Sequence, residues 1–437
     1  MSEKETGAGK RRKFLTNVSW IVGMKILQML LGLIFSAWTA RYLGPSNLGT
    51  ISYVASFVSF FTSIATLGLN NIIIKELQDH EDEQGKVLGT GILMRIAASI
   101  FSAVCIVALV CALNGNDPEL RKIAILESIY LSFSSFELIT YWYHNRLESK
   151  VASMIQTIAY IGMSVYRVFC LMQGKNIYWF SFNDSLNAMI MAFLLYLSFR
   201  HYSSQPMGWD GKLGKQMLSK SHHFIASGLM VAIYSEMDKI MIKGWMDSYS
   251  VGQYSIASGI NTLWAFILQA LIDSAYSIIV EEYRRGDKER YHLRIIQLYS
   301  AVFWFSIFVS ALITIFARPV ILILYGSDYL PAVNCLRVTT WINTFAYLGV
   351  ARGAWMVCED NQSYQKWILG IGSLVNIVLN SLWIPSLGIE GAALATVVTQ
   401  VVTSMIAPLF FARTRENTGF ILQAMHPKVL KELIRRN

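Results

Sequence analysis

Long hydrophobic stretches alternate with short polar segments along all 437 residues of the chain. A membrane-spanning helix needs about 20 mostly apolar residues. Stretches of about this length lie near 17–39, 49–70, 88–113, 123–143, 151–171, 180–199, 223–242, 252–279, 296–316, 333–357, 366–384 and 389–411. Seven of the eight prolines fall in or beside the segments between them, where helices are expected to break. The pattern predicts an all-α integral membrane protein with about twelve transmembrane helices.

The amino-acid composition indicates that lipid, and not water, surrounds much of the chain. Hydrophobic residues make up 54% of the chain and charged residues only 15%, whereas soluble domains have about 25% charged residues. The net charge of +9 is divided among short segments, and a nucleic-acid-binding protein would instead gather it on one face. The five cysteines include no C-x-x-C pair, so we predict no disulfide framework, no metal site and no cofactor.

Lys and Arg set the orientation, because cytoplasmic loops are enriched in them. With the N-terminus placed inside, the inner segments hold 25 of these residues and the outer segments hold 6. The first hydrophobic stretch is too long for a signal peptide and lacks a small-residue cleavage site. We therefore predict an uncleaved first span and two cytoplasmic termini.

The longest polar connection, residues 200–222, contains three Gly and one Pro between its ends and lies between the sixth and seventh spans. It predicts a linker between two six-helix lobes. The predicted organisation is a basic N-terminus (1–16), an N-terminal lobe (17–199), the cytoplasmic linker (200–222), a C-terminal lobe (223–411) and a basic tail (412–437).

A short internal echo supports two related lobes. The segment Leu48-Gly49-Thr50-Ile51-Ser52 opens the second span, and Val251-Gly252-Gln253-Tyr254-Ser255 opens the eighth. Because six helices separate them, the two lobes would have the same orientation and form a parallel repeat. The tail mixes Phe420, Ile421 and Leu422 with later basic residues, which suits either an interfacial helix on anionic lipid or a solvated tail.

Ionisable side chains inside spans cost about 2.5–3.5 kcal/mol each on insertion scales, so they are functional candidates. One interpretation is a water-filled cavity with cationic walls for an anionic ligand, because Arg can bind phosphate through two hydrogen bonds. The alternative is that basic residues neutralise nearby acids or extend toward the membrane surface. The candidate cavity cations are Lys25, Arg95, Arg167, Lys239, Arg337 and Arg352.

Acidic residues within spans could instead bind a proton or Na⁺ and couple it to transport. The candidates are Asp238, Asp273 and Glu137, and each could equally be a structural counter-ion. Glu236 and Lys239 are three residues apart and can touch. Asp238 lies about 100° from Lys239 around the helix and faces elsewhere.

Two asparagines in the eleventh span are suited to holding helices together. Asn376 and Asn380 are four residues apart and share one face, and buried amides can hydrogen-bond across helices. The run GIEGAALAT, residues 388–396, is rich in small residues that allow close helix approach. We interpret both features as packing devices.

Nucleotide-binding and zinc-protease motifs are absent. The chain has no G-x-x-x-x-G-K-[ST], G-x-G-x-x-G or H-E-x-x-H sequence, and its loops are too short for an ATPase domain. A transporter of this design must draw energy from a gradient, from a partner or from consumption of its substrate.

Four segments resemble bacterial polysaccharide-biosynthesis flippases of the multidrug/oligosaccharidyl-lipid/polysaccharide exporter superfamily. They are RYLGPSNLGTISYVASF (41–57), EMDKIMIKGWMDSYSVGQYSIA (236–257), ILYGSDYLPAV (323–333) and NIVLNSLWIPSLGIEGAALAT (376–396). The resemblance implies two six-helix lobes around a central cavity that opens alternately to either side. It also implies an undecaprenyl-pyrophosphate-linked oligosaccharide as cargo, delivered outward across the bacterial inner membrane. Polysaccharide polymerase and ligase would be partners, alongside membrane lipids.

One departure and two alternatives bear on this resemblance. Family members often have a proline early in the seventh span, where this chain has Ser221-His222-His223-Phe224. Drug and cation antiporters of the superfamily use acidic residues in the first lobe, whereas the first span here carries Lys25 and no acid. A membrane glycosyltransferase or polymerase would need a sizeable outer loop or acidic catalytic loop, which the sequence lacks. We therefore expect a transporter and not an enzyme.

Overall fold

The structure is a computed structural model that describes the backbone of residues 7–146 and 148–429, and the side chains of residues 29, 31–146 and 148–429. This part of the chain is helical and contains no β-strand. Its α-helices are α1 (Gly7–Ala65), α2 (Ile73–Asp79), α3 (Gln84–Leu113), α4 (Pro118–Ser134), α5 (Leu138–Asn145), α6 (Ser149–Met172), α7 (Ile177–Ser181), α8 (Asn183–Tyr202), α9 (Gly211–Trp245), α10 (Ser248–Arg285), α11 (Lys288–Leu324), α12 (Ala332–Thr339), α13 (Ile342–Cys358), α14 (Gln365–Val401) and α15 (Arg415–Ala424). Short 3-10 turns join several of them, and a π-helical turn, Val402–Ile406, follows α14.

Two of these helices are each two helices joined at a kink. α1 has 59 residues and bends at Gly44, whose φ is 72°. α14 has 37 residues and bends at Gly388, whose φ is 62°. Both values lie in the left-handed region, where glycine carries no Cβ penalty. Pro45 directly follows the first kink, and proline suits the first position of the next helix because its missing N–H needs no partner there.

The helices account for the twelve predicted spans. Eight segments within the described chain are long and apolar enough to cross a membrane. Two of them lie in the kinked helices α1 and α14, each of which consists of two helices and so accounts for two of the predicted spans. α9 covers the seventh predicted span, although it carries several charged residues, and α12 with α13 covers the tenth.

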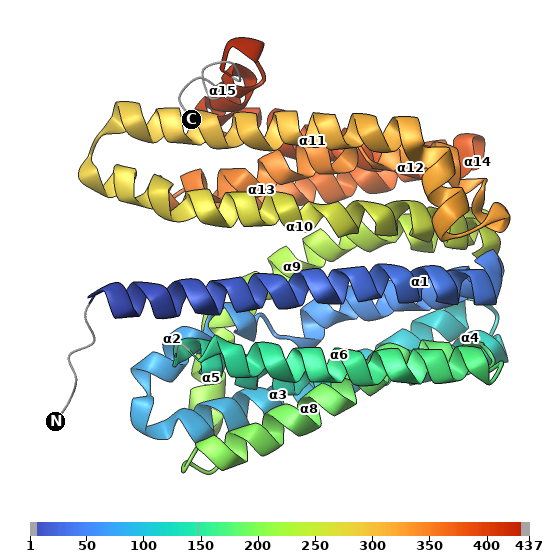
Figure 1. The fold of residues 1–437 in the computed structure, drawn as a ribbon, viewed down its shortest axis with the longest axis horizontal. Coiled ribbons are helices and arrows are strands. Elements are labelled where there is room, and N and C mark those ends of the chain that lie inside the picture. The colour runs from blue at the N-terminus through green and yellow to red at the C-terminus, as the bar shows by residue number, and fades with distance from the viewer. Residues whose placement is uncertain (1–6, 147, 430–437) are drawn as a thin grey trace. The chain divides into compact units, whose positions relative to one another are not determined.

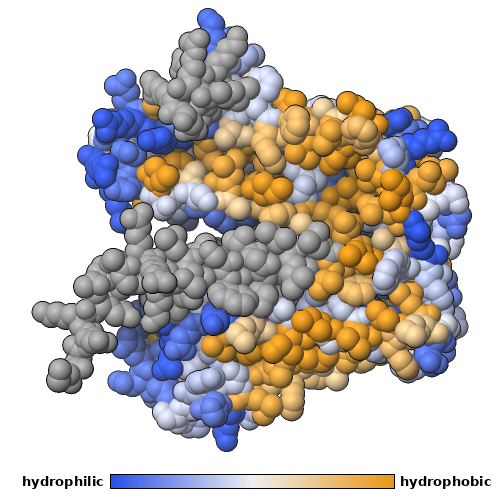
Figure 2. All heavy atoms as spheres, in the orientation of Figure 1, coloured by the Kyte–Doolittle hydropathy of each residue, from blue (hydrophilic) through white to orange (hydrophobic). Residues whose placement is uncertain are grey.

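The surface of these helices is hydrophobic along their middle parts. Figure 2 shows hydrophobic side chains gathered there and hydrophilic ones toward the helix ends. Large apolar side chains are widely exposed, for example Val104 at 64%, Ile315 at 70% and Leu374 at 65%. Apolar patches of this extent are unfavourable in water and favourable in lipid. The protein is therefore a multi-pass membrane protein.

The chain forms two compact units. The first comprises Met1–Leu43 and Val54–Leu229, and the second comprises Gly44–Tyr53 and Met230–Asn437. In the first unit α4 packs against α3 and α8, and α8 also packs against α6 (Figure 1). In the second unit α10, α11 and α13 pack on one another, and α12 packs on α10, α11 and α14.

The predicted linker of residues 200–222 is largely helical. Its irregular segment covers residues 203–210, because α8 ends at Tyr202 and α9 begins at Gly211. Residues 211–222 form the first part of α9, and the boundary between the two compact units lies inside this helix. Asp210 begins this helix by accepting the N–H groups of Lys212 and Leu213 at 2.8 and 3.2 Å. These bonds favour the charged carboxylate and lower the pKa of Asp210.

The C-terminal tail forms a helix that packs on the second unit. α15 contacts α11, and its Asn417 donates to the Tyr299 hydroxyl at 2.7 Å. Phe420 and Ile421 are buried in the hydrophobic core of this unit. These two side chains therefore face protein, and neither the predicted lipid surface nor water covers them. Residues 430–437 lie outside the described chain.

The two segments of the internal echo meet inside the second unit. A Cβ atom at Gly49 would lie 1.7 Å from the Ser248 carbonyl oxygen, and one at Gly252 would lie 2.0 Å from the Pro45 carbonyl oxygen. Only glycine permits so close an approach of two backbones. The contact is reciprocal, because each glycine faces the residue four positions before the other glycine. This reciprocity agrees with a two-fold relation between the two segments.

Candidate ion and substrate sites

Asp238 is the centre of a buried polar network in the second unit. Its side chain is 1% exposed and accepts hydrogen bonds from four side chains. Asn380 and Thr396 donate to it at 2.6 Å and Asn376 at 3.3 Å, and the Tyr254 hydroxyl also donates. Three helices, α9, α10 and α14, therefore meet at one carboxylate.

The local sequence explains how α14 contributes three of these donors. Asn376 and Asn380 share a face before the kink at Gly388, and Thr396 follows the kink. The two limbs of α14 lie close enough that a Cβ atom at Gly391 would be 2.3 Å from the Trp383 carbonyl oxygen. The asparagines thus join helices by hydrogen bonds, as their spacing predicts.

The partners of Asp238 are all uncharged. The nearby Lys239 instead pairs with Glu236 at 2.9 Å, as their spacing predicts. A buried carboxylate is costly unless it is neutralised or well hydrogen-bonded. Asn380 Oδ1 has no hydrogen-bond partner among the described residues, so an unused oxygen lies on a residue that donates to the carboxylate. A carboxylate can bind a proton or a small cation, and an amide oxygen can serve as a second ligand to the cation. The described residues contain no group of three or more His, Cys, Asp or Glu side chains that could hold a metal ion.

Arg352 has a local structural role in the second unit. It is 1% exposed, and its Nη1 donates to the carbonyl oxygens of Thr403 and Ser404, both at 3.1 Å. These carbonyls belong to the π-helical turn Val402–Ile406, where the regular helical hydrogen bonds are displaced. The guanidinium therefore satisfies backbone acceptors that the π turn leaves available.

Arg95 occupies a similar position in the first unit. It is 1% exposed, and its Nη1 donates to Asn70 at 3.1 Å. Glu137 interacts with it electrostatically without forming an ion pair. Both cation and acid are thus inside the helix packing of this unit.

The remaining candidates are more exposed. Arg167 lies 3.9 Å from Asp184, which is 76% exposed. Arg337 is exposed and donates to Asn334 at 3.2 Å. Asp273 is exposed and accepts from Gln269 at 2.8 Å. Lys25 lies in α1, but its side chain is outside the described residues.

The structure divides the candidates between the two units. Arg95, Arg167 and Glu137 belong to the first unit, and Lys239, Arg337, Arg352, Asp238 and Asp273 belong to the second. Sequence reasoning did not anticipate Tyr254 and Thr396 as partners of Asp238. It also missed Glu127 in α4, which is 8% exposed. The rule that selected Glu137, an acid within a predicted span, would also have selected Glu127.

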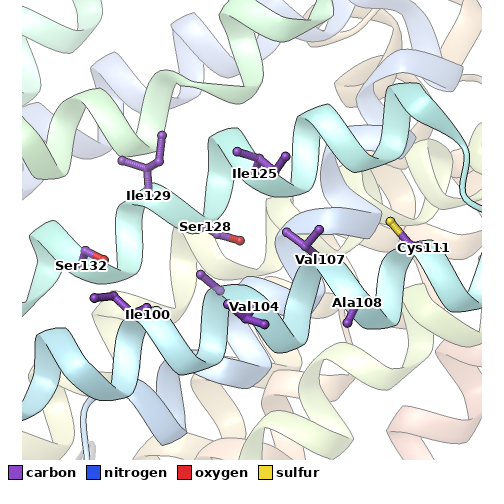
Figure 3. Close-up of a pocket in the computed structure, with 10 residues that line it drawn as sticks. Ile100, Val104, Val107, Ala108, Cys111, Ile125, Ser128, Ile129 and Ser132 are labelled. Carbon is purple, nitrogen blue, oxygen red and sulfur yellow. The ribbon is translucent and has the colours of Figure 1, made fainter.

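A groove of about 560 Å³ lies between α3 and α4 in the first unit (Figure 3). Ile100, Val104 and Val107 line one side, and Ile125 and Ile129 line the other. The Ser128 hydroxyl at its wall already donates to the Ala124 carbonyl at 2.5 Å. Most of its lining is aliphatic, with Ser128 and Ser132 as its hydroxyl-bearing residues, so the groove mainly offers space for hydrocarbon.

Comparison with known proteins gives the chain a family and shows which solved structures share its fold. Residues 14–276 match the family described as polysaccharide biosynthesis protein. No curated protein sequence matches the chain. Three solved structures share its fold. The lipid II flippase MurJ, in an inward closed conformation, has 17% identity over 95% of this chain and 91% of its own, with a TM-score of 0.72.

The other two are transporters of the MATE family. An inward-facing multidrug resistance MATE transporter of the MOP superfamily has 13% identity over 91% of this chain and 96% of its own, with a TM-score of 0.69. The eukaryotic MATE transporter AtDTX14 has 14% identity over 97% of this chain and 99% of its own, with a TM-score of 0.62. The chain therefore shares the fold of these three proteins.

Proposed function

Because this chain belongs to the polysaccharide biosynthesis protein family, we propose that it is a flippase for undecaprenyl-pyrophosphate-linked oligosaccharide. It would carry this cargo from the cytoplasmic to the outer leaflet of the bacterial inner membrane by alternating access, with both termini in the cytoplasm. The product would supply O-antigen, capsule or exopolysaccharide synthesis, with a polymerase and a ligase acting next. The family match carries the proposal, and the shared fold with a lipid II flippase supports it.

The anionic pyrophosphate explains the cationic residues within the spans. We propose that Lys25, Arg95, Arg167, Lys239, Arg337 and Arg352 create a positive potential for this head group. Arg167 and Arg337 would touch it, because their guanidinium groups are partly or fully exposed. Arg95 and Arg352 are buried and hydrogen-bonded, so they would act through helix position and long-range charge.

We further propose that Asp238 couples transport to a proton or Na⁺. Its buried carboxylate has donors from three helices and no cationic partner, so an ion at this position would neutralise it. Asp273 and Glu137 are additional candidates for the same role. The anionic cargo itself gains about 2.3 kcal/mol per elementary charge per 100 mV on moving out of a negative interior. The ion would then reset the empty carrier.

The primary test is complementation of a strain that lacks its own flippase and makes a glycan of known structure. Expression of this chain should restore surface glycan, and Arg167→Ala should reduce it at an unchanged protein level. Arg167→Lys should retain part of the output, because the charge remains while the two-bond geometry is lost. Failure to restore glycan with any of several donor strains, together with export of cationic drugs, would favour an antiporter instead.

The coupling test uses proteoliposomes that contain labelled lipid-linked sugar. Translocation should rise with a potential that is positive on the delivery side, and with a proton or Na⁺ gradient. Asp238→Asn should abolish the response to the ion gradient while leaving the response to potential. A rate that ignores both gradients would show that consumption of cargo outside drives the cycle.

A further inference from the structure

Glu127 stands out among the buried groups that the proposed mechanism does not use. It lies on the buried stripe of α4 that also contains Leu120, Ala124 and Leu131. The residue is 8% exposed, and both carboxyl oxygens lack a hydrogen-bond partner among the described residues. Such a group is exceptional, because buried polar side chains are almost always satisfied.

The elements packed against α4 supply no counter-charge to Glu127. α4 packs against α3, α7, α8 and the 3-10 turn Ser135–Glu137. Their titratable or charged groups include Arg95 and Cys105 of α3, Tyr178 of α7, Asp184 of α8 and Glu137 of the turn, and α4 itself carries Glu119, Arg121, Lys122 and Tyr130. Arg95 donates to Asn70, and Asp184 acts on Glu127 as another negative charge. Asp184 therefore makes a charged Glu127 less favourable.

The backbone beside Glu127 is held by a side chain from a neighbouring helix. Ser185 of α8 donates to the Leu126 carbonyl at 2.6 Å and accepts the Tyr130 N–H at 3.0 Å. An α-helix normally pairs these two backbone groups with each other, so the hydroxyl is inserted at this turn of α4. Ser102 of α3 has a buried hydroxyl without a hydrogen-bond partner in the described chain. Ser99, one turn before it, bonds to the Leu131 carbonyl at 2.9 Å, which places Ser102 near the level of Glu127 in this antiparallel pair.

An ionised carboxylate in this position would be desolvated without donors and would face another acid. Such a group is strongly unfavourable and takes up a proton instead. A metal cation would need several oxygen ligands converging on it, and the described surroundings of Glu127 show no such set. We propose that Glu127 is a proton-binding site, occupied by a proton while α4 is packed against α3 and α8. Water reaching Glu127 would let the carboxyl release that proton.

The site has a role in transport only if the proposed flippase function holds. In that case the first unit would carry a proton-dependent carboxyl of its own, separate from Asp238 in the second. Opening of the α4–α8 contact at Ser185 would expose Glu127, and closing would require the proton to return. The reaction is a reversible protonation, in which a carboxylate and a proton form a neutral carboxyl.

Dicyclohexylcarbodiimide tests the site without measuring transport. This reagent takes up the proton of a carboxyl group in apolar surroundings and bonds to the resulting carboxylate, and mass spectrometry locates the product. The full-length protein in lipid nanodiscs should be labelled at Glu127, and Glu127→Gln should remove that label. Glu236, which is paired with Lys239 at 2.9 Å, is the matched control and should stay unlabelled. Labelling should fall about tenfold for each pH unit once the carboxylate form dominates.

Three outcomes would overturn the proposal. A folded protein with no label at Glu127 at any pH would show a charged, paired carboxylate. Protection by Na⁺ at constant pH would show a metal cation in place of the proton. Reduced thermal stability of Glu127→Gln, beyond that of Ser128→Ala, would show that the native state needs the charged form. Labelling at Glu127 in a protein that fails to move lipid-linked sugar would instead reject the flippase function alone.

Discussion

Asp238 and Glu127 are both buried acids within membrane-spanning helices, but their surroundings are opposite. Asp238 accepts hydrogen bonds from four side chains, whereas neither oxygen of Glu127 has a partner in the described chain. The first arrangement stabilises a negative charge or an ion bound to it, and the second stabilises a neutral carboxyl. The hydrogen-bond donors around a buried acid, and not its burial alone, therefore determine its role in a membrane protein.

The largest difference is expected on removal of the carboxyl of Asp238. Asp238→Ala would leave four buried donors without their acceptor, and we expect a loss of about 2–4 kcal/mol in stability. The measurement is thermal or denaturant unfolding of the purified protein in detergent. Asp273→Ala is the control, because Asp273 is exposed, and it should change stability little. Equal losses in the two variants would contradict the importance of the network.

A smaller effect is expected when one donor of the network is removed. Asn380→Ala would delete the 2.6 Å bond to Asp238 and the 3.1 Å bond to Asn376. We expect a loss of about 1–2 kcal/mol. Combining it with Asp238→Ala should give less than the sum of the two losses, because both variants break the same bond. Additive losses would show that the two residues act independently.

The contact beside Glu127 predicts a similar or slightly smaller effect in the first unit. Ser185→Ala would remove the hydroxyl between the Leu126 carbonyl and the Tyr130 N–H. We expect a loss of about 1 kcal/mol, together with faster hydrogen exchange at Tyr130, because its amide loses this acceptor. Ser128→Ala is the neighbouring control. Unchanged hydrogen exchange at Tyr130 would mean that its N–H bonds to the Leu126 carbonyl when the Ser185 hydroxyl is absent.

The smallest effect is expected at Glu127 itself. Glu127→Gln keeps the shape of a neutral carboxyl, so stability near pH 4, where the unfolded carboxyl is also largely protonated, should change by less than about 0.5 kcal/mol. As pH rises above the ordinary glutamate pKa of about 4.3, the unfolded wild-type chain loses a proton that the folded protein keeps, so the variant should become the more stable protein. Unfolding curves of both proteins near pH 4 and at neutral pH provide the measurement. A wild-type protein that becomes more stable relative to the variant as pH rises would show that Glu127 is charged in the folded protein.

Local features of the chain were predictable because they depend on spacing alone. Hydrophobic segment length indicated twelve spans, and the three-residue spacing of Glu236 and Lys239 indicated their ion pair, which the structure confirms. The four-residue spacing of Asn376 and Asn380 placed both on one helix face, and both bond to Asp238. Helical periodicity is set by backbone geometry, so it can be read without knowing what the helix packs against.

The partners across helices depended on the tertiary structure. Thr396 reaches Asp238 only because α14 folds back at Gly388, and Arg352 finds its acceptors only because a π turn frees the carbonyls of Thr403 and Ser404. The start of α9 inside the predicted linker also depends on the fold, because Asp210 accepts the first N–H groups of this helix. The sequence by itself determined which segments are helical and lipid-facing, because hydrophobicity and period are local. The depth, register and kinks of packed helices decided which buried acid received donors and which received none, because those contacts join residues far apart in the chain.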